Sequence, residues 1–378
     1  MTEYRRIIAL APLLIGLAAG RGDAAALDPT SPLFTAYTQG DVSLSSGNYV
    51  FELGTDRPSL VFFNGPLFTT VATGFVYNGI NVFDFHSLQV ASGANIFVNQ
   101  SSASGPIALL SSTSINMGGS IDVSAGPFVG NGFSGGPGAG NTGVGGNGNL
   151  GTTGTGGPGG AIPTGGGGGG FGGFGQQGQS APIFDPFTHM QVGTVPGGVG
   201  GGGVYESLAD RLQGGSMGGF GGNSNFYGGG LFVPGGPGSG GGAIELGAVQ
   251  TVSISGMILA NGSQPVTGGT QTVGPGGGGS GGGVFLHGNS VDLSGTISAS
   301  GGAGGSGRSN GGVGSGGLVL AEFSGSFGDS GTVNVGSGPY AGRFDVASVP
   351  EPSSLILLGI SAMVGVAATR SRWSRRSS

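Results

Sequence analysis

Residues 243–262 read AIELGAVQTVSISGMILANG, and the fold prediction starts from this stretch. Apolar and polar residues alternate in its second half, so Val252, Ile254 and Ile258 would share one face of an extended backbone. A short apolar run precedes the alternating part, and a Ser-Gly corner interrupts it. Alternation over such short runs is typical of half-buried β-strands. We therefore predict three short strands in this stretch.

The same pattern recurs along the chain. Its alternating positions correspond to Val291, Leu293 and Ile297 in one further copy, and to Val333 and Val335 in another. A repeat of about 20 residues with glycine at its corners is typical of a solenoid, in which each coil buries its face only against its neighbours. The fold we expect is all-β, a β-solenoid and most simply a right-handed parallel β-helix; the competing antiparallel sandwich does not predict the repetition. The aligned copies are residues 82–101, 107–126, 243–262, 284–302 and 318–337.

Glycine is concentrated in particular parts of the chain. The 95 glycines are sparse in residues 27–125 and dense in residues 126–242, and further tracts follow the third strand of later copies, at 261–283 and 301–317. Long loops at one corner leave the rest of a stacked ladder intact. We therefore expect a body of residues 27–348 with residues 126–242 as a Gly-rich insertion. The aromatic-rich segment 48–81 would form the first coils or a cap over the open end of the stack.

Two features of the insertion have alternative interpretations. Glycines spaced by three, such as Gly148, Gly151 and Gly154, would suit packed polyproline-II strands. Chance spacing is the interpretation we favour, because glycine is so frequent there and loses much conformational entropy on ordering. Separately, Leu208 and Leu212 lie at helical spacing, which indicates one short packing helix within residues 204–212.

Composition excludes several functions. Between Leu27 and Val349 there are four arginines against 14 carboxylates, a net charge of −10, so we expect no binding of nucleic acid. The chain has no cysteine, which excludes disulfides and thiolate metal sites. It also has no lysine, which excludes a phosphate-binding loop of the Walker type.

Candidate catalytic and metal-binding residues are scattered. His86, His189 and His287 are isolated, although His86 and His287 follow the first strand of two aligned copies. The carboxylates occur singly, with one in each of several strands, and have no basic partner nearby in sequence. We expect no catalytic residues, no metal and no cofactor; the alternative is a β-helical carbohydrate-active enzyme, a polysaccharide lyase or hydrolase. These carboxylates are Asp84, Asp122, Glu245, Asp292 and Glu322.

The N-terminal residues predict export. Arg5 and Arg6 precede an apolar stretch, and Ala24 and Ala26 form an A-x-A site for cleavage before Leu27. We therefore expect residues 1–26 to be a signal peptide, handled by the general secretion machinery and signal peptidase. Cleavage after Gly20 is the alternative.

The C-terminal residues form a second processing signal in three parts. Val349, Pro350, Glu351 and Pro352 form a proline-flanked acidic hinge, and the apolar run that follows spans about 21 Å as a helix, short of a hydrocarbon core of roughly 30 Å. An arginine cluster at the end should stay cytoplasmic and leave the body outside. We expect a transient membrane helix in residues 349–378. The run begins with Leu355, Ile356, Leu357 and Leu358 and ends at Ala368, and the basic tail contains Arg370, Arg372, Arg375 and Arg376.

This segment resembles the PEP-CTERM sorting signal, which some domain catalogues label as an ice-binding protein C-terminal domain. The resemblance implies an exported protein of a Gram-negative bacterium, processed by the membrane transpeptidase exosortase and destined for the cell surface or an exopolysaccharide matrix such as a biofilm. It concerns an address and not an activity. For ice binding itself the aligned second strands offer no threonine ladder. We therefore expect a secreted structural or adhesive protein, with exopolysaccharide as a candidate partner.

Overall fold

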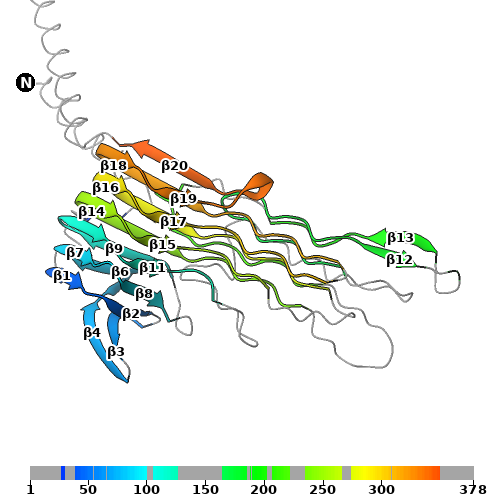
Figure 1. The fold of residues 1–378 in the computed structure, drawn as a ribbon, viewed down its shortest axis with the longest axis horizontal. Coiled ribbons are helices and arrows are strands. Elements are labelled where there is room, and N and C mark those ends of the chain that lie inside the picture. Colours follow the sequence, from blue (N-terminus) through cyan, green and yellow to red (C-terminus); the bar gives the residue numbers. More distant parts are fainter. Residues whose placement is uncertain are drawn as a thin grey trace, which may run out of the picture.

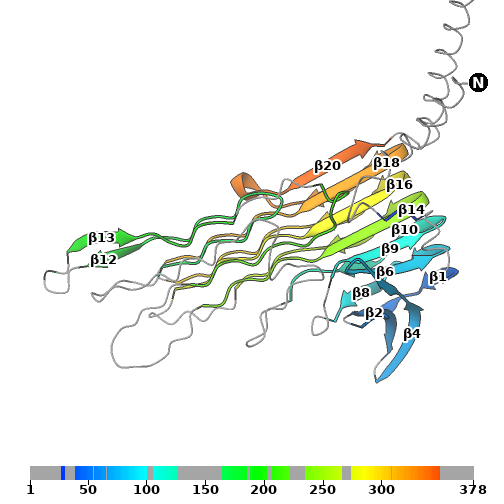
Figure 2. The same ribbon diagram turned by 180° about the vertical axis from the view of Figure 1, so that it is seen from behind.

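The computed structural model describes residues 27–29, 39–53, 55–64, 66–99, 105–126, 164–184, 188, 190–201, 207–221, 235–265, 274–307 and 309–349. Its regular elements are β-strands and one 3-10 turn, η1 (Gly338–Tyr340). The strands of the two large sheets occupy one end of the molecule, and glycine-rich segments extend from them to the other end (Figures 1 and 2). The structure confirms the all-β class that the alternating residues predict.

The five sequence repeats form five consecutive rungs, which we number 1 to 5. In rungs 3 to 5 the first two predicted strands are continuous, because one long strand with a register shift spans both. The strands of rung 1 are β6 (Ile80–Phe85), β7 (Ser87–Val90) and β8 (Ala94–Val98), and those of rung 2 are β9 (Ile107–Ser111), β10 (Ser114–Met117) and β11 (Ser120–Asp122). Rung 3 has β14 (Ala243–Ile254) and β15 (Met257–Leu259), rung 4 has β16 (Gly283–Leu293) and β17 (Thr296–Ser298), and rung 5 has β18 (Leu318–Asp329) and β19 (Thr332–Asn334).

All pairs between successive rungs are parallel. In the first sheet, β7, β10, β14, β16 and β18 are adjacent in that order, with β6 and β9 extending the ladder of the first strands. In the second sheet the order is β8, β11, β15, β17 and β19. Parallel pairing excludes the antiparallel sandwich for the rungs, and it puts equivalent residues of successive repeats side by side.

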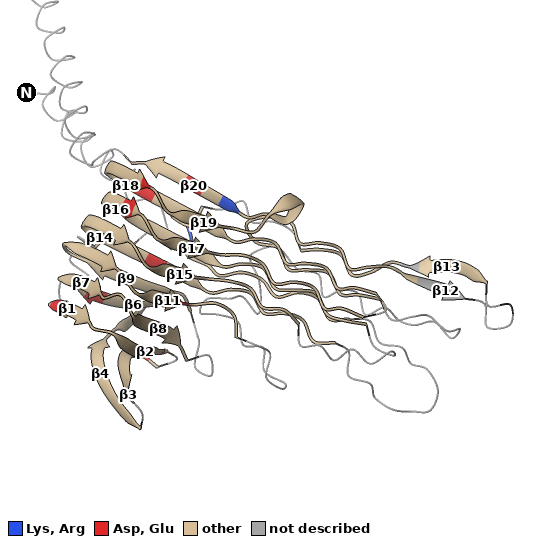
Figure 3. Ribbon diagram, viewed as in Figure 1, with Lys and Arg blue, Asp and Glu red and all other residues tan. Residues whose placement is uncertain are grey.

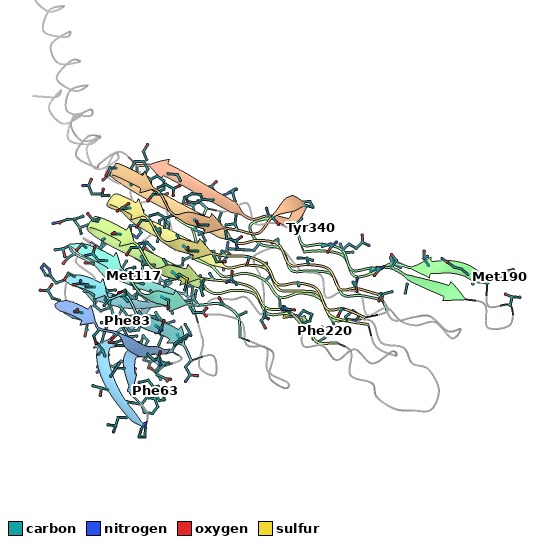
Figure 4. The ribbon with its side chains drawn as sticks, viewed as in Figure 1. Phe63, Phe83, Met117, Met190, Phe220 and Tyr340 are labelled. Atoms are coloured by element: carbon teal, nitrogen blue, oxygen red, sulfur yellow. The ribbon has the colours of Figure 1, made fainter. Side chains whose placement is uncertain are left out.

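The main core lies between the two sheets. The second sheet contributes one column of aligned side chains, Ile96, Ile121, Ile258, Ile297 and Val333, of which the four isoleucines are fully buried. The predicted inward residues of the first sheet are buried as well (Figure 4 shows Phe83 and Met117 among this core). Burying an aliphatic side chain of this size contributes about 1.5–3 kcal/mol relative to exposure, so the period-two pattern supplies the main packing energy of the rungs.

The large insertion between rungs 2 and 3 does not interrupt the ladder. Although residues 123–242 separate β11 from β14 in sequence, Ile121 pairs with Ile258 and Ile115 pairs with Val252. Glycine tracts leave the rungs after β11, β15 and β17, at the corner predicted from the sequence. This confirms that the chain extends one corner and keeps the strands in register.

The described glycine tracts lie side by side and form a second layer, which we call the glycine bundle. Its segments are residues 164–180, 196–201, 213–221, 235–242, 260–265, 274–282, 299–307 and 310–317. Hydrogen bonds between its segments recur every three residues: the amides of Gly215, Gly218 and Gly221 donate to residues 241, 238 and 235. None of the described bundle glycines has a positive φ. A three-residue repeat of this kind is the period of polyproline II, so the bundle consists of packed helices of that type.

The bundle shows glycine tracts of this chain packed closely against one another. The glycines of residues 148–160, to which our two interpretations refer, lie outside the described residues, whereas the tracts from residue 164 onward pack against one another. A Cβ atom at Gly277 would lie 2.0 Å from the carbonyl oxygen of Gly167, and a Cβ atom at Gly218 would lie 2.2 Å from that of Gly277. Only glycine permits this backbone approach, and the hydrogen bonds between segments oppose the conformational entropy that glycine loses on ordering.

The remaining strands complete the two sheets. Before rung 1, β1 (Asp41–Leu44) and β2 (Gly47–Glu52) each pair in parallel with that rung, β3 (Ser59–Asn64) and β4 (Leu67–Thr73) extend the second sheet as an antiparallel hairpin, and β5 (Phe75–Tyr77) pairs with β6. The aromatic-rich segment 48–81 thus covers one end of the stack, and β20 (Arg343–Ser348) follows rung 5 at the other. A separate hairpin, β12 (Ala181–Phe184) with β13 (Gln191–Val195), lies at the tip of the glycine bundle (Figure 1).

Two expectations differ from the structure. The described part of residues 204–212 is a turn in which the amides of Asp210 and Arg211 both donate to Ser207, so the predicted helix is wrong there. Leu208 and Leu212 are nevertheless buried, because they pack on the outer face of the first sheet. The second difference concerns closure: the described strands form two curled sheets, and a closed β-helix is not confirmed. Glycine-rich residues connect β15 to β16 and β17 to β18.

Candidate functional site

The outer face of the first sheet carries a second apolar cluster. Ile80, Val82, Ala108, Phe285 and Leu320 line this face. It is covered by side chains from distant parts of the chain, namely Leu27, Phe171, Leu208 and Leu212. The first strand of each rung is therefore buried on both sides, which explains why its residues form an apolar run and not an alternating one.

A buried polar centre lies within this cover. Glu245 of β14 is 1% exposed, and its Oε1 atom accepts a hydrogen bond of 2.9 Å from the backbone nitrogen of Leu27. The same oxygen lies 2.8 Å from Nε2 of His287 on β16. Leu27 is itself 6% exposed. We call these three residues the Glu245 centre; it joins the start of the described chain to rungs 3 and 4.

The imidazole of His287 lies in a space beside rung 3 that the neighbouring residues define. Its ring stacks on Phe285 with a centroid distance of 4.8 Å and an interplanar angle of 19°. In the register of the sheet His287 is paired with Gly247, where a Cβ atom would lie 2.2 Å from Nε2. Glycine at 247 therefore leaves the space through which the ring reaches Glu245.

A groove next to the Glu245 centre contains both ends of the predicted mature body. It has a volume of about 350 Å³ and is lined by Asp28 and Pro29 from the N-terminal side and by Val349 from the C-terminal side. The amide of Val349 donates to the carbonyl oxygen of Phe323, which holds the end of β20 along rung 5. The described residues nearest to the two predicted processing signals thus lie at the same end of the strand stack, away from the tip of the glycine bundle (Figure 1).

The single carboxylates of the first strands lie on rungs that are not adjacent. Asp84, Glu245 and Glu322 all point to the outer face of the first sheet, but they belong to rungs 1, 3 and 5. Strands two rungs apart are separated by about 10 Å. Asp122 accepts a local hydrogen bond from the amide of Ser124, and Asp292 is an exposed residue near the end of β16. In the described part of the chain, no three His, Asp or Glu residues are grouped as metal ligands.

The histidines are not paired either. Through the paired residues Gly247 of rung 3 and Leu110 of rung 2, His287 is in register with Asp84 of rung 1 and not with His86. The prediction that the two histidines occupy similar positions is therefore wrong. His86 is exposed, and its Nδ1 lies 3.0 Å from the hydroxyl of Ser112 in the next rung. His189 lies outside the described residues.

The glycine bundle presents an uncharged amide surface. The charged residues of the described chain lie in and beside the strands, and the described bundle segments have none (Figure 3). Side chains project at three-residue intervals, as with Gln176 and Gln179, whose Oε1 atoms accept bonds from the amides of Val313 and Asn310. A groove of about 500 Å³ lies between these segments, lined by Gln176, Gln177, Gln179, Ala303, Gly304, Gly305, Ser306, Asn310, Gly311 and Val313. Neutral amides and hydroxyls are suitable partners for sugar hydroxyls.

The aromatic residues of the bundle have different roles. Phe171 is fully buried against the outer face of the first sheet and is an anchor, whereas Phe174 is 58% exposed. Phe220 is half-buried on the bundle surface (Figure 4). Phe226 and Tyr227 lie outside the described residues.

Most predicted sorting residues lie outside the described structure. This holds for Ala24 and Ala26, for residues 350–352 and for the apolar run and basic tail, while Val349 is described as the exposed residue that follows β20. In the described residues no helix is long and apolar enough to cross a membrane. The Glu245 centre was not predicted, because Leu27 and Glu245 are 218 residues apart in sequence.

The fold and the site define the class of this protein, which is an all-β protein of stacked parallel rungs with an appended glycine bundle. Comparison with protein families adds the processing signal, because residues 348–372 match the model of the PEP-CTERM protein-sorting motif. The chain therefore carries this motif, as the resemblance of its C-terminus predicted. No curated protein and no solved structure matches the chain.

The motif implies the fate of the chain. A PEP-CTERM signal implies export, transient anchoring in the membrane through the C-terminus, and recognition by exosortase. The motif covers 25 residues near the C-terminus, so the match gives no information on the activity of residues 27–347.

Proposed function

We propose that this protein is a non-catalytic structural or adhesive component of the outer surface or extracellular polysaccharide matrix of a Gram-negative bacterium. In this proposal its rungs act as a β-solenoid scaffold. Signal peptidase and the secretion machinery deliver it, and exosortase processes it near residues 350–352. The body is then released from its transient anchor with the glycine bundle available to other molecules.

One observation carries the proposal: Asp28 and Val349 line the same groove, at the end of the molecule opposite the bundle tip. While the C-terminal segment holds the chain in the membrane, this polarity directs the bundle away from the lipid. The backbone segments of the bundle hydrogen-bond to one another, and the described ones carry no charged residue. Such a surface would contact neutral or anionic polysaccharide through hydrogen bonds without charge repulsion from the acidic body.

The partner we propose is exopolysaccharide bound along the amide groove. The groove residues are on neighbouring segments whose spacing the backbone hydrogen bonds fix, so their donors and acceptors are arranged before any ligand arrives. Single sugar contacts of this type are weak. Many of them along a rod, or many rods along a polymer, would give useful avidity.

The test uses mature protein purified from envelopes of producing cells, incubated with exopolysaccharide from the same cells. We expect the protein to sediment with the polymer, and the polymer to keep its length on size-exclusion chromatography. Replacing Gln177 and Asn310 by alanine should weaken co-sedimentation, whereas Val192→Ala on the distal hairpin serves as the control. Shortening of the polymer by wild-type protein would favour the carbohydrate-active enzyme instead, and absence of binding would contradict the adhesive role.

A further inference from the structure

The backbone nitrogen of Leu27 has an unusual environment for a residue so near the start of the chain. It donates to a carboxylate that is 1% exposed, over a sequence separation of 218 residues. The Leu27 side chain packs in the apolar cluster on the outer face of the first sheet, together with Phe285 and Leu320. The sequence independently places a signal-peptidase site directly before this residue.

We propose that cleavage between Ala26 and Leu27 creates the mature N-terminus and that its α-ammonium group is the buried counter-ion of Glu245. Signal-peptide removal then completes the fold of the exported protein. In the cleavage, water adds across the peptide bond: the carbon–nitrogen bond breaks, Ala26 leaves as a carboxylate, and Leu27 retains a protonated amine. The inference requires export but does not depend on the proposed role in the matrix.

The cleaved chain is the better partner for the Glu245 carboxylate, because its Leu27 nitrogen is positively charged. A carboxylate that is withdrawn from water needs a hydrogen-bonded cation, and removal of one member of such a pair is strongly destabilising. Among the described residues no arginine forms an ion pair with Glu245; its partners there are Leu27 and His287. Before cleavage the Leu27 nitrogen is a neutral amide with one N–H. After cleavage it carries a positive charge at neutral pH and has three N–H donors.

The surroundings fit a bound terminus. His287 closes one side of Glu245, and it reaches this position because Gly247 has no side chain. A chain that started earlier would place a neutral amide, and not a charged amine, at this nitrogen beside Glu245. Cleavage after Gly20 would leave Leu27 as an amide in the interior of the chain.

The absence of lysine makes a direct test possible. A mature chain has one primary amine, its own N-terminus, so an amine-acetylating reagent has a single target. Full-length protein is exported in a bacterial host and purified after processing, and mass spectrometry reports the first residue and the rate of acetylation in native buffer and in urea. We expect a chain that begins at Leu27, with an amine acetylated at least about tenfold more slowly in the native state than in urea.

Variants identify the carboxylate as the partner. Glu245→Gln should lose most of the protection, while Glu52→Gln, which removes a half-buried carboxylate from the second sheet, should keep it. If Glu245→Gln does not accumulate, Glu245→Asp provides the comparison, because it retains the charge but shortens the reach and should give an intermediate rate. A mature chain that begins at Arg21, equal acetylation in both conditions for wild type, or unchanged protection in Glu245→Gln would each overturn the inference.

Discussion

The glycine bundle gives a quantitative prediction at Gly277, which contacts three other segments. Its amide donates to the carbonyl of Gly219 at 2.9 Å, its carbonyl accepts from Gly238 at 2.8 Å, and a Cβ atom at this position would lie 2.0 Å from the carbonyl oxygen of Gly167. An ordinary carbon–oxygen contact needs about 3.3 Å or more. The substitution Gly277→Ala must therefore separate these segments by over an ångström.

The expected cost follows from opposing terms. Overpacking in a well-packed interior costs about 1–3 kcal/mol, and two weakened backbone hydrogen bonds add about 1–2 kcal/mol. Alanine restricts the unfolded chain relative to glycine, which returns about 0.4–1 kcal/mol. We thus expect Gly277→Ala to destabilise the bundle by about 2–4 kcal/mol. The loss is local if the bundle opens separately from the rungs.

Urea denaturation combined with limited proteolysis measures both possibilities. We expect a lower midpoint and faster cleavage within residues 235–282, while fragments that contain the rungs survive. Val199→Ala is the control, because this bundle residue is 54% exposed and its truncation leaves the backbone contacts unchanged. If Gly277→Ala matched wild type in midpoint and cleavage rate, the close packing of the bundle would be refuted.

Three further predictions concern the core, the anchor of the bundle and the sorting signal. Ile258→Ala should lower the free energy of unfolding by about 2–5 kcal/mol in urea denaturation, because it leaves a cavity at a fully buried site between the sheets. Met257→Ala, on the exposed face, should change this free energy little. Equal effects of the two substitutions would contradict the register. Phe171→Ala should expose the bundle to protease and Phe174→Ala should not, since only Phe171 packs against the first sheet; identical digestion patterns would argue against an anchoring role. Deleting residues 350–352 should leave unprocessed chain in the membrane fraction, as detected by fractionation and intact mass, and normal release would show that these residues are dispensable for processing.

Local pattern in the sequence was sufficient for the rungs. Alternation at Val252, Ile254 and Ile258 predicted strands with a defined inner face, because a two-residue period can bury only one side of an extended chain. Repetition of the pattern predicted parallel stacking, and the C-terminal motif was recognised because its three parts are contiguous. The helix proposed around Leu208 failed for the converse reason: two leucines at a spacing of four indicate burial, but they do not specify the backbone that achieves it.

The strand pattern, the all-β class and the sorting signal are thus encoded in short stretches, where side-chain chemistry alone is informative. The glycine bundle is different, because glycine has no side chain to carry a pattern and its order depends on backbone groups of other segments. The Glu245 centre depends likewise on folding, which brings together Leu27, Glu245 and His287 from distant positions. Hydrogen bonds between groups that are remote in sequence form only once the rungs have fixed the separation of those groups. The glycine bundle and the Glu245 centre were therefore decided by the tertiary structure.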